Sequence, residues 1–87
     1  MTKDTGVIKE REETELLALL NNTVEFHPER MAVLFQIIFA MTQERWTDLQ
    51  NLTLTYGTYV KKNDIFERKL FVTLMLYAYE KQLQNIG

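Results

Sequence analysis

Two stretches of the chain are apolar on every side of the helices that they would form. Residues 31–41 read MAVLFQIIFAM, with Gln36 as the one polar residue, and residues 70–79 read LFVTLMLYAY, with Thr73 as the one polar residue. A surface helix of a small domain carries its apolar residues on one side. Because 87 residues are too few to enclose two such helices completely, the pattern predicts an exposed apolar surface that binds a second subunit or another protein.

The pattern of the first half predicts two helices joined by a short connection. The first begins near residue 9, because Glu10, Glu12 and Glu13 would lie in its first turn, where the helix dipole favours negative charge. It buries an aliphatic stripe that consists of Leu16, Leu19, Leu20 and Val24. Pro28 fits the first position of the second helix, with His27 or a neighbour as its cap. Thr42 and Thr47 are competing caps for a third helix, so the boundary between the second and third helices is expected within 42–47.

Residues 52–60, LTLTYGTYV, are compatible with either a strand or a helix. Their Thr, Tyr and Val content and their alternation are typical of a strand. A helix would instead place Leu52, Tyr56 and Val60 on one face, and a lone strand would have no partner in a helical chain. The helix is therefore favoured, and a last helix follows from Asn63 or Asp64 to about residue 84.

These elements predict an all-α fold of three or four helices, forming a bundle that dimerisation completes. A flexible segment of residues 1–8 precedes a single helical domain of residues 9–87. The last helix is the expected dimer element. The residues expected at the dimer interface, or in a core shared by two chains, are Leu70, Phe71, Leu74, Met75, Tyr77 and Leu83. Six aromatic residues follow the predicted buried faces, so they are expected to fill the core rather than to line a ligand pocket: Phe35, Phe39, Phe66, Phe71, Tyr77 and Tyr79.

Composition narrows the class of protein. With 46% hydrophobic residues, one Pro and three Gly, the chain is typical of globular proteins. A formal charge of −2 argues against a nucleic-acid or membrane-surface partner. The absence of cysteine excludes disulfides and thiolate chemistry, and it suits the cytoplasm. Residues 1–9 lack the apolar run of a secretory signal, and both apolar stretches are too short to cross a bilayer.

The residues that could carry chemistry are few. His27 is the single histidine, and we interpret it as a turn or capping residue rather than as a catalytic group or a ligand. Glu44 and Asp48 lie one helical turn apart and could share a proton or a cation, but the nearby Arg45 and a solvated helix face explain them equally well. The chain contains neither a glycine-rich phosphate loop nor a nucleophile elbow. We therefore expect no enzyme activity, no cofactor and no metal.

Residues 41–60, MTQERWTDLQNLTLTYGTYV, resemble the helix-turn-helix segment of phage-repressor-like regulators. Thr42, Gln43 and Glu44 match the opening of the motif's first helix, and Asn51 takes the place of its turn glycine. The resemblance implies that Thr53 caps a recognition helix. The residues that this helix would turn toward DNA, together with the lysines that follow it, are Thr55, Tyr56, Tyr59, Lys61 and Lys62. Two features depart from the motif: a glycine occupies position 57, and no arginine lies between positions 45 and 61.

The sequence is consistent with three functions. The first is a small cytoplasmic, non-enzymatic regulatory or accessory protein that acts as a homodimer and binds a protein partner. The alternative is a dimeric helix-turn-helix transcriptional regulator that binds DNA. A third is an immunity or antitoxin protein, which rests on fold-level analogy alone.

Overall fold

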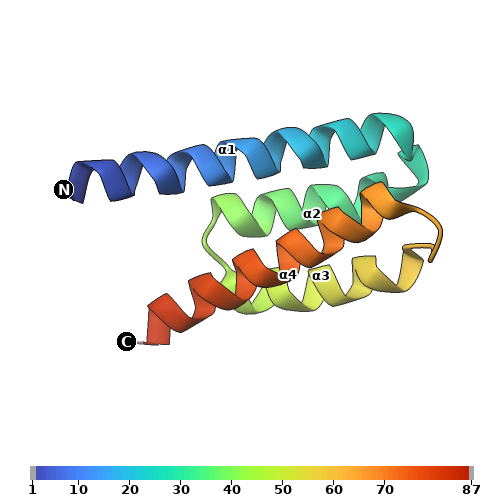
Figure 1. Cartoon of the computed structure of the whole chain (residues 1–87). Coiled ribbons are helices and arrows are strands. Elements are labelled where there is room, and N and C mark those ends of the chain that lie inside the picture. The colour runs from blue at the N-terminus through green and yellow to red at the C-terminus, as the bar shows by residue number, and fades with distance from the viewer. Residues whose placement is uncertain (1, 87) are drawn as a thin grey trace.

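The computed structural model describes the backbone of residues 2–86 and the side chains of residues 12–84. This part of the chain forms four α-helices and one short 3-10 helix (Figure 1). The elements in chain order are α1 (Thr2–Phe26), η1 (Pro28–Arg30), α2 (Met31–Thr42), α3 (Trp46–Tyr59) and α4 (Ile65–Ile86). The predicted all-α fold is confirmed with four helices, and residues 52–59 are helical.

The first helix begins at Thr2, upstream of the start predicted near residue 9. The prediction followed Glu10, Glu12 and Glu13, whose acidic side chains are typical of a first helical turn, whereas residues 2–8 contain no proline that would end a helix. The side chains of residues 1–8 lie outside the described part, so the predicted flexibility of this segment stays a prediction.

The helices pack around one apolar core. α3 packs against α2 on one side and α4 on the other, and α1 contacts both α2 and α4. α4 crosses the bundle obliquely, as Figure 1 shows. The core is built from Leu16 and Leu20 of α1, Leu34, Ile37, Ala40 and Met41 of α2, Leu49 and Tyr56 of α3, and Leu70, Leu74, Tyr77 and Ala78 of α4. Among residues 2–86, no helix combines the length and the hydropathy that a membrane span requires.

The break between α2 and α3 falls within the predicted interval. Glu44 adopts a left-handed backbone with φ of 56°. This conformation lets its N–H donate to the carbonyl of Met41 at 3.2 Å, and the N–H of Arg45 donates to the carbonyl of Ala40 at 2.9 Å. The two bonds form a Schellman motif, in which glycine is the usual left-handed residue. The helix therefore ends without a sequence signal as clear as a glycine.

α4 begins with the predicted cap. The Asp64 carboxylate accepts a hydrogen bond from the backbone N–H of Glu67 at 3.0 Å. This bond satisfies one of the N–H groups that a helix start leaves unpaired. Upstream, Gly57 of α3 makes room for α4, because a Cβ at this position would meet the ring of Phe71. Asp64 and Gly57 therefore fix where α4 starts and how closely it approaches α3.

Residues 41–60 do not form the predicted helix-turn-helix. Asn51, which would occupy the turn, lies inside the continuous helix α3. Thr42 ends α2 rather than opening a helix, and Gln43 and Glu44 belong to the connection. The predicted turn is wrong, because the chain turns about seven residues earlier than the motif requires.

Candidate functional site

A buried carboxylate joins three elements at one end of the bundle. Glu67 of α4 is 1% exposed. Its Oε1 accepts hydrogen bonds from the Tyr56 hydroxyl at 3.2 Å and from Nε of Arg30 at 3.3 Å. Nη2 of Arg30 also donates to the carbonyl of Tyr59 at 2.6 Å, and the guanidinium lies 5.6 Å from the centre of the Tyr59 ring. Burial, followed by the Glu67 charge, raises the pKa of Tyr56 above its ordinary range.

His27 lies beside this cluster in the turn between α1 and η1. Its Nδ1 is 3.0 Å from Oε1 of Glu29, and its Nε2 is 3.4 Å from Oδ2 of Asp64. The ligand atoms of His27, Asp64 and Glu67 lie within 4.8 Å of one another, so these three residues could together hold a divalent cation. Each carboxylate already has another task, however: Arg30 neutralises Glu67 and Asp64 caps α4. We interpret the cluster as a set of structural contacts that hold η1, α3 and α4 together.

The pairing of Arg30 with Glu67 was not predicted from the sequence. The signal for it is the position of Glu67, which lies three residues before Leu70 and seven before Leu74 on the buried stripe of α4. A carboxylate at such a position needs a buried cationic or hydrogen-bonding partner. The sequence does not reveal that this partner is Arg30, which lies 37 positions away.

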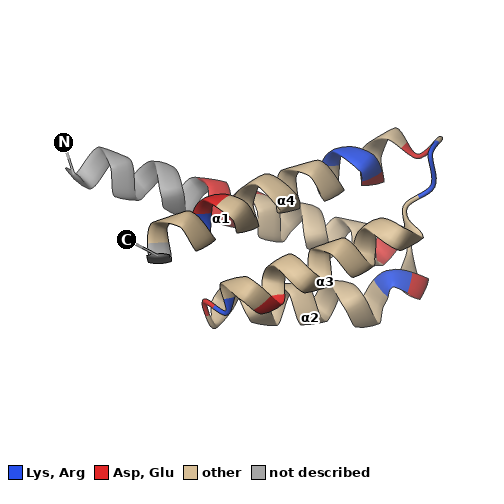
Figure 2. Ribbon diagram, turned by 90° about the horizontal axis from the view of Figure 1, so that it is seen from below, with Lys and Arg blue, Asp and Glu red and all other residues tan. Residues whose placement is uncertain are grey.

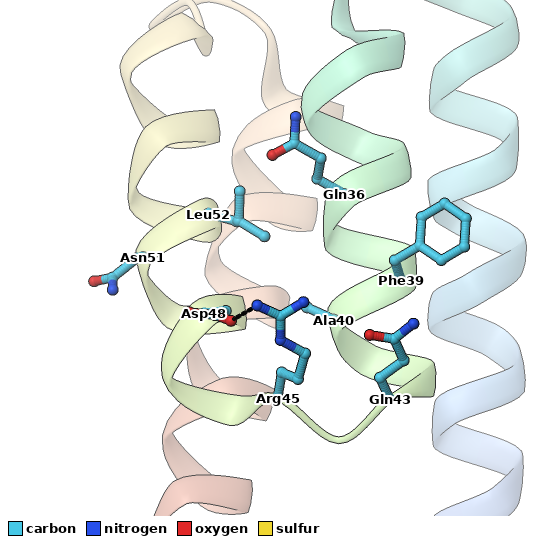
Figure 3. A pocket seen from close by; sticks show the side chains of 8 residues that line it. All are labelled: Gln36, Phe39, Ala40, Gln43, Arg45, Asp48, Asn51 and Leu52. Atoms are coloured by element: carbon cyan, nitrogen blue, oxygen red, sulfur yellow. Dashed lines mark ion pairs between the residues drawn. The ribbon is translucent and has the colours of Figure 1, made fainter.

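A groove of about 470 Å³ lies between α2 and α3 (Figure 3). Arg45 and Asp48 form an ion pair at its edge, at 2.5 Å. The other lining residues are Gln36, Phe39, Ala40, Gln43, Asn51 and Leu52. Glu44 does not share a helix with Asp48, since it precedes α3, so the predicted carboxylate pair on one helix face is wrong. Asp48 instead pairs with Arg45.

α4 carries a second apolar face that points away from the core. The residues of this outward face of α4 are Ile65, Val72, Leu76, Tyr79 and Leu83, each between 52% and 69% exposed. At about 100° of rotation per residue, they centre on the side of the helix opposite Leu70, Leu74 and Tyr77. Between positions 70 and 79 the ribbon carries no charged residue, as Figure 2 shows. The exposed apolar surface predicted from the sequence is therefore present.

The predicted interface residues lie mostly on the other side of α4. Leu70, Leu74 and Tyr77, expected at the dimer interface or in a core shared by two chains, are buried in the core of the single chain. Phe71 packs toward Gly57 of the same chain. Met75 is half-buried, and Leu83 is exposed on the outward face. The helix is apolar on both sides, and the other helices of the chain cover the side that carries Leu70, Leu74 and Tyr77.

Of the five residues predicted to contact DNA, the structure buries one and exposes four. Tyr56 is fully buried and bonded to Glu67, which corrects its placement on an outward face. Thr55, Tyr59, Lys61 and Lys62 are exposed, and the Tyr59 ring lies against the Arg30 guanidinium. These exposed residues do not lie on a separate recognition helix, because α3 continues through Asn51.

Four aromatic residues expected in the core are exposed. Phe35 and Phe39 follow Met31 at intervals of one turn on α2, and all three are more than 40% exposed. Phe66 and Tyr79 of α4 are exposed as well. The exposed row of Met31, Phe35 and Phe39 is a second apolar surface, on a helix other than α4.

Comparisons with protein-family models, curated proteins and solved structures found no match to this chain.

Proposed function

We propose that this chain is a non-catalytic regulatory or accessory protein that acts by binding protein and works as a homodimer. The observation that carries the proposal is the outward face of α4, where five large apolar side chains lie in one row with more than half of their surface exposed. Removing apolar surface from water stabilises a complex by about 25 cal/mol for each Å² buried. A contiguous row of this kind is typical of surfaces that bind protein.

The polar side chains around Glu67 favour a binding role for the protein over a catalytic one. The buried carboxylate of Glu67 is held by Arg30 and Tyr56, and the Asp64 carboxylate caps α4. A catalytic acid or base needs an open position at which substrate can approach within hydrogen-bond distance. These groups already contact each other, and their bonds hold the helices together.

The two exposed rows suit two separate binding tasks. The outward face of α4 is assigned to a second copy of the chain, and the row of Met31, Phe35 and Phe39 on α2 to a protein partner. Since the rows lie on different helices, one substitution can disable one task alone. Phe39→Glu should abolish capture of the partner and leave the homodimer intact, while Leu76→Glu should give a folded monomer.

The experiment measures molar mass by light scattering and partner capture from extracts of the native cells for both variants. Thr58→Glu is the matched control, because it adds the same charge at an exposed position of α3 that lies outside both rows and outside the groove beside Phe39. The proposal predicts a lower mass for Leu76→Glu alone and a lost partner for Phe39→Glu alone. If wild type and Phe39→Glu retain the same proteins, and all variants share one mass, the proposal is wrong.

A further inference from the structure

We infer that the outward face of α4 binds the same face of a second copy, with the two α4 helices antiparallel and related by a two-fold axis near residue 74. This inference rests on the proposed homodimer and specifies its interface. It follows from three features of the described residues: the spacing of the apolar row, the distribution of charge along α4, and an acidic groove beside it.

The apolar row has the spacing of a coiled-coil seam. Positions 65, 69, 72, 76, 79 and 83 are separated alternately by four and three residues. At about 100° per residue they all stay within about 40° of one line along the helix. All but Lys69 are large apolar residues. A helix with such a seam buries it most completely against another helix that carries the same spacing, and the outward face of a second copy supplies one.

An antiparallel pair centred near residue 74 places apolar residues opposite each other. Residues equally far from the axis then face one another, so that Ile65 lies opposite Leu83 of the partner subunit. Val72 likewise lies opposite Leu76 of the partner subunit. Each contact occurs twice because of the two-fold axis. The paired length from residue 65 to residue 83 is about 27 Å at 1.5 Å per residue.

The charges favour the antiparallel direction. The start of α4 and the loop before it carry four exposed basic residues, namely Lys61, Lys62, Arg68 and Lys69. Farther along α4, Glu80 lies in the wall of a groove of about 300 Å³ between α1 and α4, together with Glu12 and Glu15. Figure 2 shows the blue turn near the start of α4 and red segments where α1 passes the later part of α4.

Lys69 and Glu80 lie on the same side of the apolar row, five and six residues from the axis. In the antiparallel pair, Lys69 therefore approaches Glu80 of the partner subunit at the acidic groove, and the symmetric contact forms as well. A parallel pair would instead bring Lys69, which occupies a position of the seam, against its own copy. Like charges across an interface oppose association, so charge complementarity selects the antiparallel arrangement.

Cysteine cross-linking tests this arrangement directly, because the chain contains no cysteine of its own. A mixture of Val72→Cys with Leu76→Cys places two thiols opposite each other close to the axis, so mild oxidation should give a mixed covalent dimer. Leu83→Cys alone should not cross-link, since the two thiols would be about 27 Å apart along the helices. A mixture of Leu83→Cys with Ile65→Cys should give the mixed covalent dimer.

Charge exchange gives a second measurement that does not depend on thiols. Lys69→Glu and Glu80→Lys should each weaken dimerisation at low salt by about tenfold, since each affects two symmetric contacts. The double variant Lys69→Glu/Glu80→Lys should recover the wild-type affinity. Recovery would not follow if the two residues made no contact across the interface.

The outcomes separate the inference from the proposal on which it rests. A dimer in which Leu83→Cys cross-links with itself would overturn the antiparallel arrangement and leave the homodimer standing. A dimer in which none of these cysteines cross-links would overturn the assignment to α4. A chain that stays monomeric at every concentration would overturn both the homodimer and the inference.

Discussion

Gly57→Ala should destabilise this protein, although a change from glycine to alanine at an exposed position inside a helix normally stabilises the folded state. Alanine exceeds glycine in helix propensity by about 1 kcal/mol. At Gly57, however, the added methyl group would meet Cε1, Cζ and Cδ1 of the Phe71 ring, with Cζ at 2.7 Å and Cδ1 at 3.0 Å. Carbon atoms in good contact are about 3.5 to 4.0 Å apart. The ring or one of the helices must therefore move.

The net magnitude is the difference between these two effects. Forcing an extra methyl group into a packed contact destabilises by about 1 to 3 kcal/mol. Subtracting the gain of about 1 kcal/mol in propensity leaves a net loss near 1 kcal/mol. Phe71→Leu removes the ring atoms Cε1 and Cζ from the contact. In that background Gly57→Ala should stabilise by about 0.5 kcal/mol, because most of the gain in propensity remains.

Urea unfolding of the four chains, followed by the fluorescence of Trp46, gives the required double-mutant cycle. The prediction is a change of sign: Gly57→Ala lowers the free energy of unfolding in the wild-type background and raises it with Phe71→Leu. If Gly57→Ala stabilised both backgrounds equally, the ring of Phe71 would not lie on Gly57. α4 would then not pack on α3 through a contact between Phe71 and Gly57.

Three further substitutions test single contacts by the same urea measurement. Tyr56→Phe should lower the free energy of unfolding by about 1.5 kcal/mol through loss of the bond to Glu67, and no change would contradict that bond. Glu44→Gly should raise the free energy of unfolding by about 1 kcal/mol, because glycine adopts the left-handed φ of 56° at lower cost than glutamate does. A lower free energy of unfolding would contradict the left-handed backbone at this position. Tyr77→Phe should leave stability unchanged or higher at pH 7, since the buried hydroxyl lacks a hydrogen-bond partner among the described residues. Burial, followed by the charges of Glu13 and Glu12, raises the pKa of Tyr77 from 10.0 to about 12, so the wild type should lose stability between these pH values as the unfolded chain ionises first. Tyr77→Phe should lose less over that interval, and equal losses would contradict the raised pKa.

Local signals in the sequence predicted the fold well. Asp64 caps α4 as expected, and the boundary between α2 and α3 falls between Thr42 and Trp46. Leu16 and Leu20 are buried as the spacing of the first stripe predicted. Caps and stripes depend on neighbours within one or two turns, so a sequence contains the information that determines them.

The side of α4 that faces the core could not be predicted in the same way. Residues 70–79 are apolar all round, so periodicity does not distinguish the face of Leu74 from the face of Leu76. The packing of α3 decides it, through the contact of Gly57 with Phe71 and the bond of Tyr56 with Glu67. Both contacts join residues that a local pattern does not relate.

Sedimentation equilibrium of the wild-type chain over a wide range of concentrations decides whether two copies associate through α4. One chain has a mass of 10.3 kDa. We expect a reversible change from that mass to twice its value as concentration rises, and the same experiment on Leu76→Glu should show the single-chain mass throughout. A wild-type chain that stays at 10.3 kDa up to the highest concentration would contradict the assignment of a second copy to the outward face of α4.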